Sequence, residues 1–75
     1  MDSLDQRLLG LFDDMGADAL DLHAFFELAG GNTPDEQAGV LAAVDRLVER
    51  GWLEERGNDF YARTERGRHA VGALR

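Results

Sequence analysis

The sequence contains no cysteine and no lysine, and its 75 residues include a single proline and a single serine. The absence of cysteine excludes disulfide bonds, cysteine nucleophiles and zinc sites built from thiolates. No stretch approaches the roughly 20 consecutive apolar residues that a membrane-spanning helix needs. Residues 1–5 have neither the basic nor the apolar segment of a secretory signal. We therefore expect a soluble, cytoplasmic protein with no membrane partner.

The residue types that catalysis or metal binding would need are also scarce. The single serine is Ser3, and the two histidines, His23 and His69, are far apart, so we expect no serine–histidine–acid set. The aspartates between positions 13 and 21 do not have the spacing of a calcium loop, which alternates oxygen ligands around a central glycine. No glycine-rich phosphate-binding loop is present. We expect a binding module that is not an enzyme and that uses no metal and no cofactor.

The composition that remains indicates one small acidic domain. Hydrophobic residues make up 44% of the chain, which is enough for one compact core and too much for a disordered tail. The net charge of −7 is unevenly distributed. Residues 1–45 hold ten carboxylates and one arginine, whereas residues 46–75 hold seven arginines and five carboxylates. An acidic chain repels nucleic acid at long range, but a locally basic patch can still contact phosphates.

Four helices are predicted from apolar periodicity and capping signals. Apolar residues at helical spacing predict helices over residues 4–15 and 22–29. In the segment 33–36, threonine, proline and glutamate occupy the cap, first-turn and capping-box positions of a third helix that runs from residue 34 to about residue 50. A last helix is expected from Thr64 to residue 71 or 74. The apolar positions of the third helix are expected to face inward: Val40, Leu41, Val44, Leu47 and Val48.

Three short extended segments complete the pattern. Residues 20–22 alternate like a very short strand, and residues 52–56 and 60–63 are two further extended runs. The last two runs are separated by Gly57-Asn58-Asp59, which is typical of a hairpin loop. The predicted order is therefore helix, strand, helix, helix, strand, strand, helix.

This order resembles the winged helix-turn-helix domain of bacterial regulators of the MarR and PadR type. The segment LVERGWLE, residues 47–54, is similar to the junction in that family between the third helix, a glycine and the first wing strand. The segment YARTERGR, residues 61–68, resembles the passage from the wing to the final helix. The resemblance covers residues 33–71. It implies an α+β fold in one domain, 1–75, with a three-helix core, a two-stranded wing and a C-terminal helix.

One departure from the family pattern leaves the register of the wing open. Arg63 stands where an aliphatic residue usually precedes Thr64. The inward face of this strand carries either Tyr61 or the pair Phe60 and Ala62, because a slip of one residue exchanges the two faces.

The resemblance implies a DNA-associated transcriptional regulator. In this family the third helix lies in the major groove and the wing touches the DNA phosphates. Gln37 and Arg46 are the side chains of the third helix that could read a base edge. Phosphate contacts would come from the wing and the start of the last helix, where arginine can grip an anion. These wing and helix residues are Arg56, Asn58, Arg63, Arg66 and Arg68.

A protein–protein interaction module is the alternative, because the predicted recognition face is small and apolar and its leading end is acidic. Such a module would dock a basic protein partner through Asp35, Glu36, Ala42 and Ala43. The residues of the third helix favour a protein, whereas family frequency favours DNA, and on that frequency we expect DNA as the first partner and a protein as the alternative.

A homodimer is predicted from apolar residues outside the main stripe. Leu9 lies beside the apolar face of the first helix, and Val71 and Leu74 belong to the last helix. Contact between these residues of two copies would form the dimer.

Overall fold

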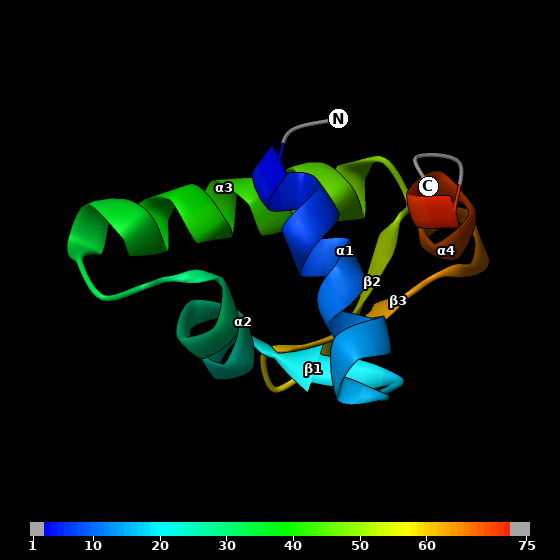
Figure 1. Cartoon of the computed structure of the whole chain (residues 1–75), viewed down its shortest axis with the longest axis horizontal. Helices are drawn as coiled ribbons and strands as arrows, with labels where there is room; N and C mark the ends of the chain where they lie inside the picture. Colours follow the sequence, from blue (N-terminus) through cyan, green and yellow to red (C-terminus); the bar gives the residue numbers. More distant parts are fainter. Residues whose placement is uncertain (1–2, 73–75) are drawn as a thin grey trace.

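The computed structural model describes residues 3–72, which form an α+β arrangement of four helices and a three-stranded antiparallel sheet (Figure 1). Each helix and strand begins and ends within one residue of a predicted position. The order of the elements is the predicted one and is compatible with a winged helix. Position 74, one of the two predicted ends of the last helix, lies outside the described residues. The elements are α1 (Ser3–Met15), β1 (Ala19–Asp21), α2 (Leu22–Ala29), α3 (Pro34–Glu49), β2 (Leu53–Gly57), β3 (Phe60–Arg63) and α4 (Glu65–Gly72).

The first turns of α2 and α3 are each capped by a side chain. Asp21 Oδ1 accepts a hydrogen bond from the backbone nitrogen of Ala24 at 2.8 Å and caps α2. Thr33 Oγ1 accepts from the backbone nitrogen of Glu36 at 3.1 Å, and the threonine hydroxyl also donates to the glutamate carboxylate. Because these contacts satisfy free amides of the first turn, the local sequence sets where each helix starts.

The sheet has β3 in its centre, between β1 and β2. Leu20 of β1 pairs with Tyr61, and Leu53 of β2 pairs with Arg63, so these four residues share one face. Leu20 and Leu53 are buried in the core, and Tyr61 packs against it. The face with Tyr61 is therefore the inward one.

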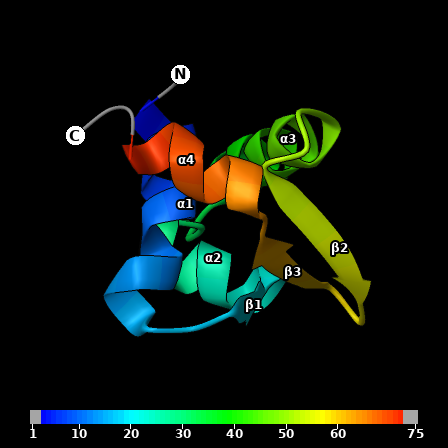
Figure 2. The same cartoon turned by 90° about the vertical axis from the view of Figure 1, so that its right-hand side faces the viewer.

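The alternative register, with Phe60 and Ala62 inward, is wrong. Phe60 is exposed, and Ala62 is buried on the opposite face, outside the main core cluster. β1 follows α1 directly and pairs with the edge of β3 that β2 leaves free. This pairing places Leu20 on the same face as Tyr61, where it packs against the helices, and the helices therefore cover this face. Figure 2 shows the β2–β3 hairpin on the side of the molecule opposite α1.

The inward stripe of α3 differs from the predicted one at two positions. Leu41 is 42% exposed, whereas Ala43 is fully buried. The buried residues Val40, Ala43, Val44 and Leu47 follow the i, i+3, i+4, i+7 spacing of one helix face, from which position 41 is rotated by about 100°. Ala43 is therefore a core residue and is not part of a docking surface.

The residues chosen for a homodimer contact are also in the core. Leu9 is fully buried and Val71 is almost so, and Leu74 lies outside the described residues. Leu9 faces inward with Leu8 and Phe12, because α1 is covered by α2, α3 and α4 on several sides. The dimer prediction therefore loses Leu9 and Val71 as contact residues.

No helix within residues 3–72 combines the length and the apolar character that crossing a membrane would require.

Candidate interaction surface

Arg63, predicted to contact phosphate, is a structural residue that joins β3 to α1. Its guanidinium donates to both carboxylate oxygens of Asp13, at 2.7 and 3.0 Å, and to the backbone oxygen of Leu9 at 3.0 Å. The guanidinium carbon also lies 5.8 Å from the ring centroid of Phe12. Only 8% of the side chain is exposed. Because Arg63 is on the same face of β3 as Tyr61, it points to the helices and away from any ligand of the wing.

Arg46, predicted to read a base, is bound to a carboxylate of α1. Its Nη2 atom donates to Asp5 Oδ1 at 2.8 Å, and the Asp5 side chain is only 2% exposed. A buried carboxylate needs such a partner, since an unpaired charge in the interior is strongly destabilising. Sequence reasoning missed Asp5. The signal was its position, because Asp5 precedes Leu8, Leu9 and Phe12 by the spacing of one helix face.

The other predicted nucleic-acid contacts do not form one strip. Gln37 donates to the backbone oxygen of Gly31 at 3.0 Å and so stabilises the turn before α3. Arg56 pairs with Glu54 at 3.1 Å, and both side chains are well exposed. Arg66 lies beside Gly51, at the junction of α3 and β2. Figure 1 places the start of α3, which carries Gln37, and α4, which carries Arg66, at opposite ends of the molecule, so these predicted contacts are spread along its length.

A small hollow brings some of the arginines together. Arg56, Arg63 and Arg68 line a hollow of about 140 Å³ beside Ala62, at the point where the hairpin meets the segment between α1 and β1. Asp18 also lines it, and two of the three guanidinium groups already bind carboxylates. The hollow is therefore much less positive than its arginines suggest.

The exposed positions of α3 hold four carboxylates, and the one cation of the helix, Arg46, is 37% exposed and paired with Asp5. Two of these carboxylates, Asp35 and Glu36, lie in the first turn, where the helix dipole favours a negative charge. Asp45 and Glu49 lie near the other end of the helix, where the helix dipole disfavours a negative charge. Helix stability therefore does not explain why carboxylates occur at these two positions. We call this surface the α3 face. Its exposed residues at positions 34–39 surround the first turns of the helix, and Leu41, Ala42, Asp45 and Glu49 lie on its outer side; the first group is Pro34, Asp35, Glu36, Gln37, Ala38 and Gly39.

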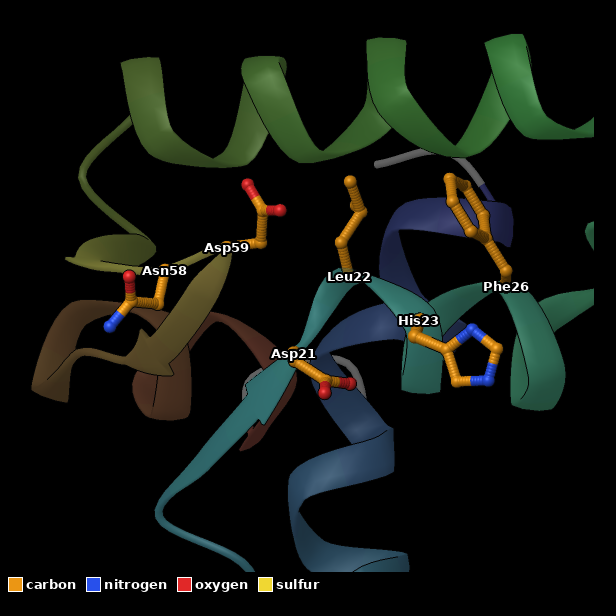
Figure 3. Close-up of a pocket in the computed structure, with 6 residues that line it drawn as sticks. All are labelled: Asp21, Leu22, His23, Phe26, Asn58 and Asp59. Carbon is orange, nitrogen blue, oxygen red and sulfur yellow. The ribbon is translucent and has the colours of Figure 1, made fainter.

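A second hollow, of about 270 Å³, lies between the start of α2 and the tip of the hairpin. Figure 3 shows the side chains of Leu22, Phe26 and Asp59 pointing toward α3. The hollow thus has an apolar wall and an acidic wall. No sequence signal indicated it, because its walls come from segments more than 30 residues apart. Its six lining residues are Asp21, Leu22, His23, Phe26, Asn58 and Asp59.

The carboxylates of α3 and of the hairpin converge near Tyr61. Burial raises the pKa of the Tyr61 hydroxyl above its usual value of 10.0, and the negative charges of Glu55, Asp59 and Asp45 raise it further. Asp45 belongs to α3, whereas Glu55 and Asp59 belong to the hairpin. We use the name acidic groove for the hollow between α2 and the hairpin.

Comparison of the chain with protein-family models, with curated protein sequences and with solved structures found no match. Within residues 3–72, no three histidine, aspartate or glutamate side chains are grouped so that they could hold a metal ion. The chemistry available at this surface is therefore that of carboxylates and exposed apolar groups. Such a surface suits a ligand that is positively charged and partly apolar.

Proposed function

We propose that this chain is a winged-helix module that binds a basic segment of a partner protein through the α3 face. The winged-helix assignment is supported by the element order, with α2 and α3 in succession and a hairpin directly after α3. One observation carries the function: the exposed positions of α3 hold four carboxylates, and the one arginine of the helix, Arg46, is paired with Asp5 of α1. In a DNA reader of this class, the same helix would enter the major groove between two rows of phosphates.

Two further observations argue against DNA sequence readout by α3. The side chains that could read a base, Gln37 and Arg46, bind Gly31 and Asp5 instead. The remaining exposed positions offer carboxylates, alanines, a glycine, a proline and Leu41, and of these groups only a carboxylate can hydrogen-bond to a base. A carboxylate there also repels the phosphate backbone, which supplies most of the affinity of a DNA-binding protein.

The same residues suit a protein partner. Ala38, Gly39 and Ala42 leave α3 narrow along its exposed side, so another backbone can approach closely. Leu41 is 42% exposed and gives this side an apolar contact. Acidic residues around such a contact favour a partner rich in arginine or lysine and increase its rate of association.

Weak, sequence-independent phosphate binding is a second candidate function. The observation that favours it is the hollow that Arg56 and Arg68 line together beside Ala62. This surface is separate from the α3 face, so the two candidates can be tested with different substitutions.

We expect a labelled amphipathic peptide of lysine and leucine to bind at micromolar concentration, and more weakly as salt is raised. The triple variant Asp35→Asn, Asp45→Asn, Glu49→Gln should bind this peptide about tenfold more weakly, since three charges leave the contact. Random duplex DNA at about 50 mM salt should not bind at tens of micromolar protein. Fluorescence anisotropy measures both ligands.

The matched control removes three exposed carboxylates elsewhere, through Asp14→Asn, Asp18→Asn and Glu65→Gln. This variant has the same net charge as the α3 triple variant and should keep the wild-type affinity. Equal losses in the two triple variants would show attraction by overall charge and would contradict the α3 face. DNA binding that is abolished by Arg56→Ala with Arg68→Ala would favour phosphate binding instead.

A further inference from the structure

We propose that the partner segment extends from the α3 face into the acidic groove, where it places one large apolar side chain next to an arginine or lysine. The apolar side chain would lie against Leu22 and Phe26, and the cation would lie beside Asp59, whose side chain points toward α3 as theirs do, whereas Asp21 points to the opposite side (Figure 3). This inference rests on the proposed function and specifies the chemistry of the partner. The hollow, of about 270 Å³, is close to the lower limit of about 300 Å³ for ligand pockets.

The apolar wall of the groove is available and held in place. Leu22 and Phe26 pack against the core but are only half-buried, so part of each side chain faces the hollow. The backbone of Gly31 supports Phe26 from behind, since a Cβ atom at position 31 would lie 2.7 Å from Phe26 Cβ. Covering this surface with an apolar side chain of the partner would remove it from water, which is favourable.

The two walls of the groove are joined by a backbone hydrogen bond. The nitrogen of Leu22 donates to the backbone oxygen of Asp59 at 2.9 Å, which fixes the start of α2 against the tip of the hairpin. The tip is a two-residue turn in which Asn58 and Asp59 have φ values of 52° and 63°. This conformation is typical of asparagine and aspartate and sets the direction of the Asp59 side chain. The groove is therefore formed before any partner binds.

The two carboxylates that line the groove come from different segments. Asp21 precedes α2, and Asp59 is in the hairpin turn. The histidine in the lining, His23, pairs with Glu27 at 2.9 Å and lies at the outer side. A phosphate group would be repelled here, whereas a basic side chain would be attracted. Charge complementarity therefore selects a basic protein segment as the occupant.

The double variant Asp21→Asn, Asp59→Asn removes two charges from the groove and keeps the local structure. Asparagine is as good a helix cap as aspartate, and it also accepts positive φ values, so both the start of α2 and the hairpin turn should be retained. An unchanged thermal midpoint confirms the fold of the variant. The matched control, Asp14→Asn with Asp18→Asn, removes two exposed charges outside the groove.

We expect the double variant to bind the lysine–leucine peptide about fivefold more weakly, and the control to bind it as the wild type does. A second peptide, with alanine in place of leucine, should bind the wild type about tenfold more weakly, because it cannot cover the apolar wall. If the α3 triple variant loses affinity but the groove variant does not, the groove inference fails and the proposed function stands. If the alanine peptide binds as well as the leucine peptide, no apolar side chain enters the groove and the inference also fails.

Discussion

Replacing Arg63 by alanine should lower the free energy of unfolding by about 2–3 kcal/mol. The substitution removes a paired contact with Asp13, the hydrogen bond to the Leu9 carbonyl and the packing of the guanidinium on Phe12. Removal of one partner of a fully buried ion pair costs more, about 3–5 kcal/mol. The smaller value applies here because the Asp13 side chain is 43% exposed and water can reach it once Arg63 is gone.

Urea denaturation followed by the fluorescence of the single tryptophan, Trp52, measures this loss. Arg56→Ala is the control, since the pair that it breaks is exposed and its loss should change stability by less than about 1 kcal/mol. Arg63→Lys should lie between the two, because lysine keeps the charge but not the paired geometry. An Arg63→Ala variant as stable as Arg56→Ala would show that the link between β3 and α1 is not important.

Gly67→Ala should destabilise the protein by about 2 kcal/mol or more, although alanine is the better helix former. Gly67 is buried where α4 packs against Trp52, in the segment between α3 and β2. A Cβ atom at this position would overlap the backbone oxygen of Trp52 and would lie 3.1 Å from Arg63 Cγ. The oxygen cannot move freely, since it also accepts a hydrogen bond from the backbone nitrogen of Thr64.

The matched control is Gly39→Ala, within α3. Gly39 is exposed and a Cβ atom there would meet nothing within 4 Å, so alanine should stabilise the helix by about 0.5–1 kcal/mol. Thermal denaturation followed by circular dichroism should thus move the two midpoints in opposite directions. If both thermal midpoints increased, α4 would not lie as close to Trp52 as the structure places it.

The order and boundaries of the elements were predictable because their signals are local. Asp21, Thr33 and Pro34 act within one turn of helix, and Gly51 ends α3 in a left-handed conformation, with φ of 77°. The face of β3 that turns inward was not predictable. It depends on the pairing of Leu20 with Tyr61, two residues 41 positions apart, and the three-residue strand that carries Leu20 has almost no pattern of its own.

The roles of the arginines were harder to predict from the sequence than the acidic start of α3. In the sequence, Arg46 and Arg63 resemble surface arginines, because their carboxylate partners are 41 and 50 residues away. The acidic leading end of α3, with Asp35 and Glu36, was visible because both residues follow the cap signal of Thr33 directly, whereas Asp45 and Glu49 were not recognised as part of its exposed side. The acidic groove was not visible in the sequence, because it forms only when the hairpin turn lies beside the start of α2.

The central claim, that the α3 face binds a basic protein segment and that duplex DNA does not bind there, is tested most directly by two-dimensional amide NMR. The protein would be titrated with the lysine–leucine peptide and, separately, with random duplex DNA. We expect the peptide to shift the amide signals of Ala38, Leu41 and Ala42, together with those of Leu22 and Asp59, while DNA leaves them unchanged. DNA-induced shifts in α3, with no shifts there from the peptide, would contradict the claim.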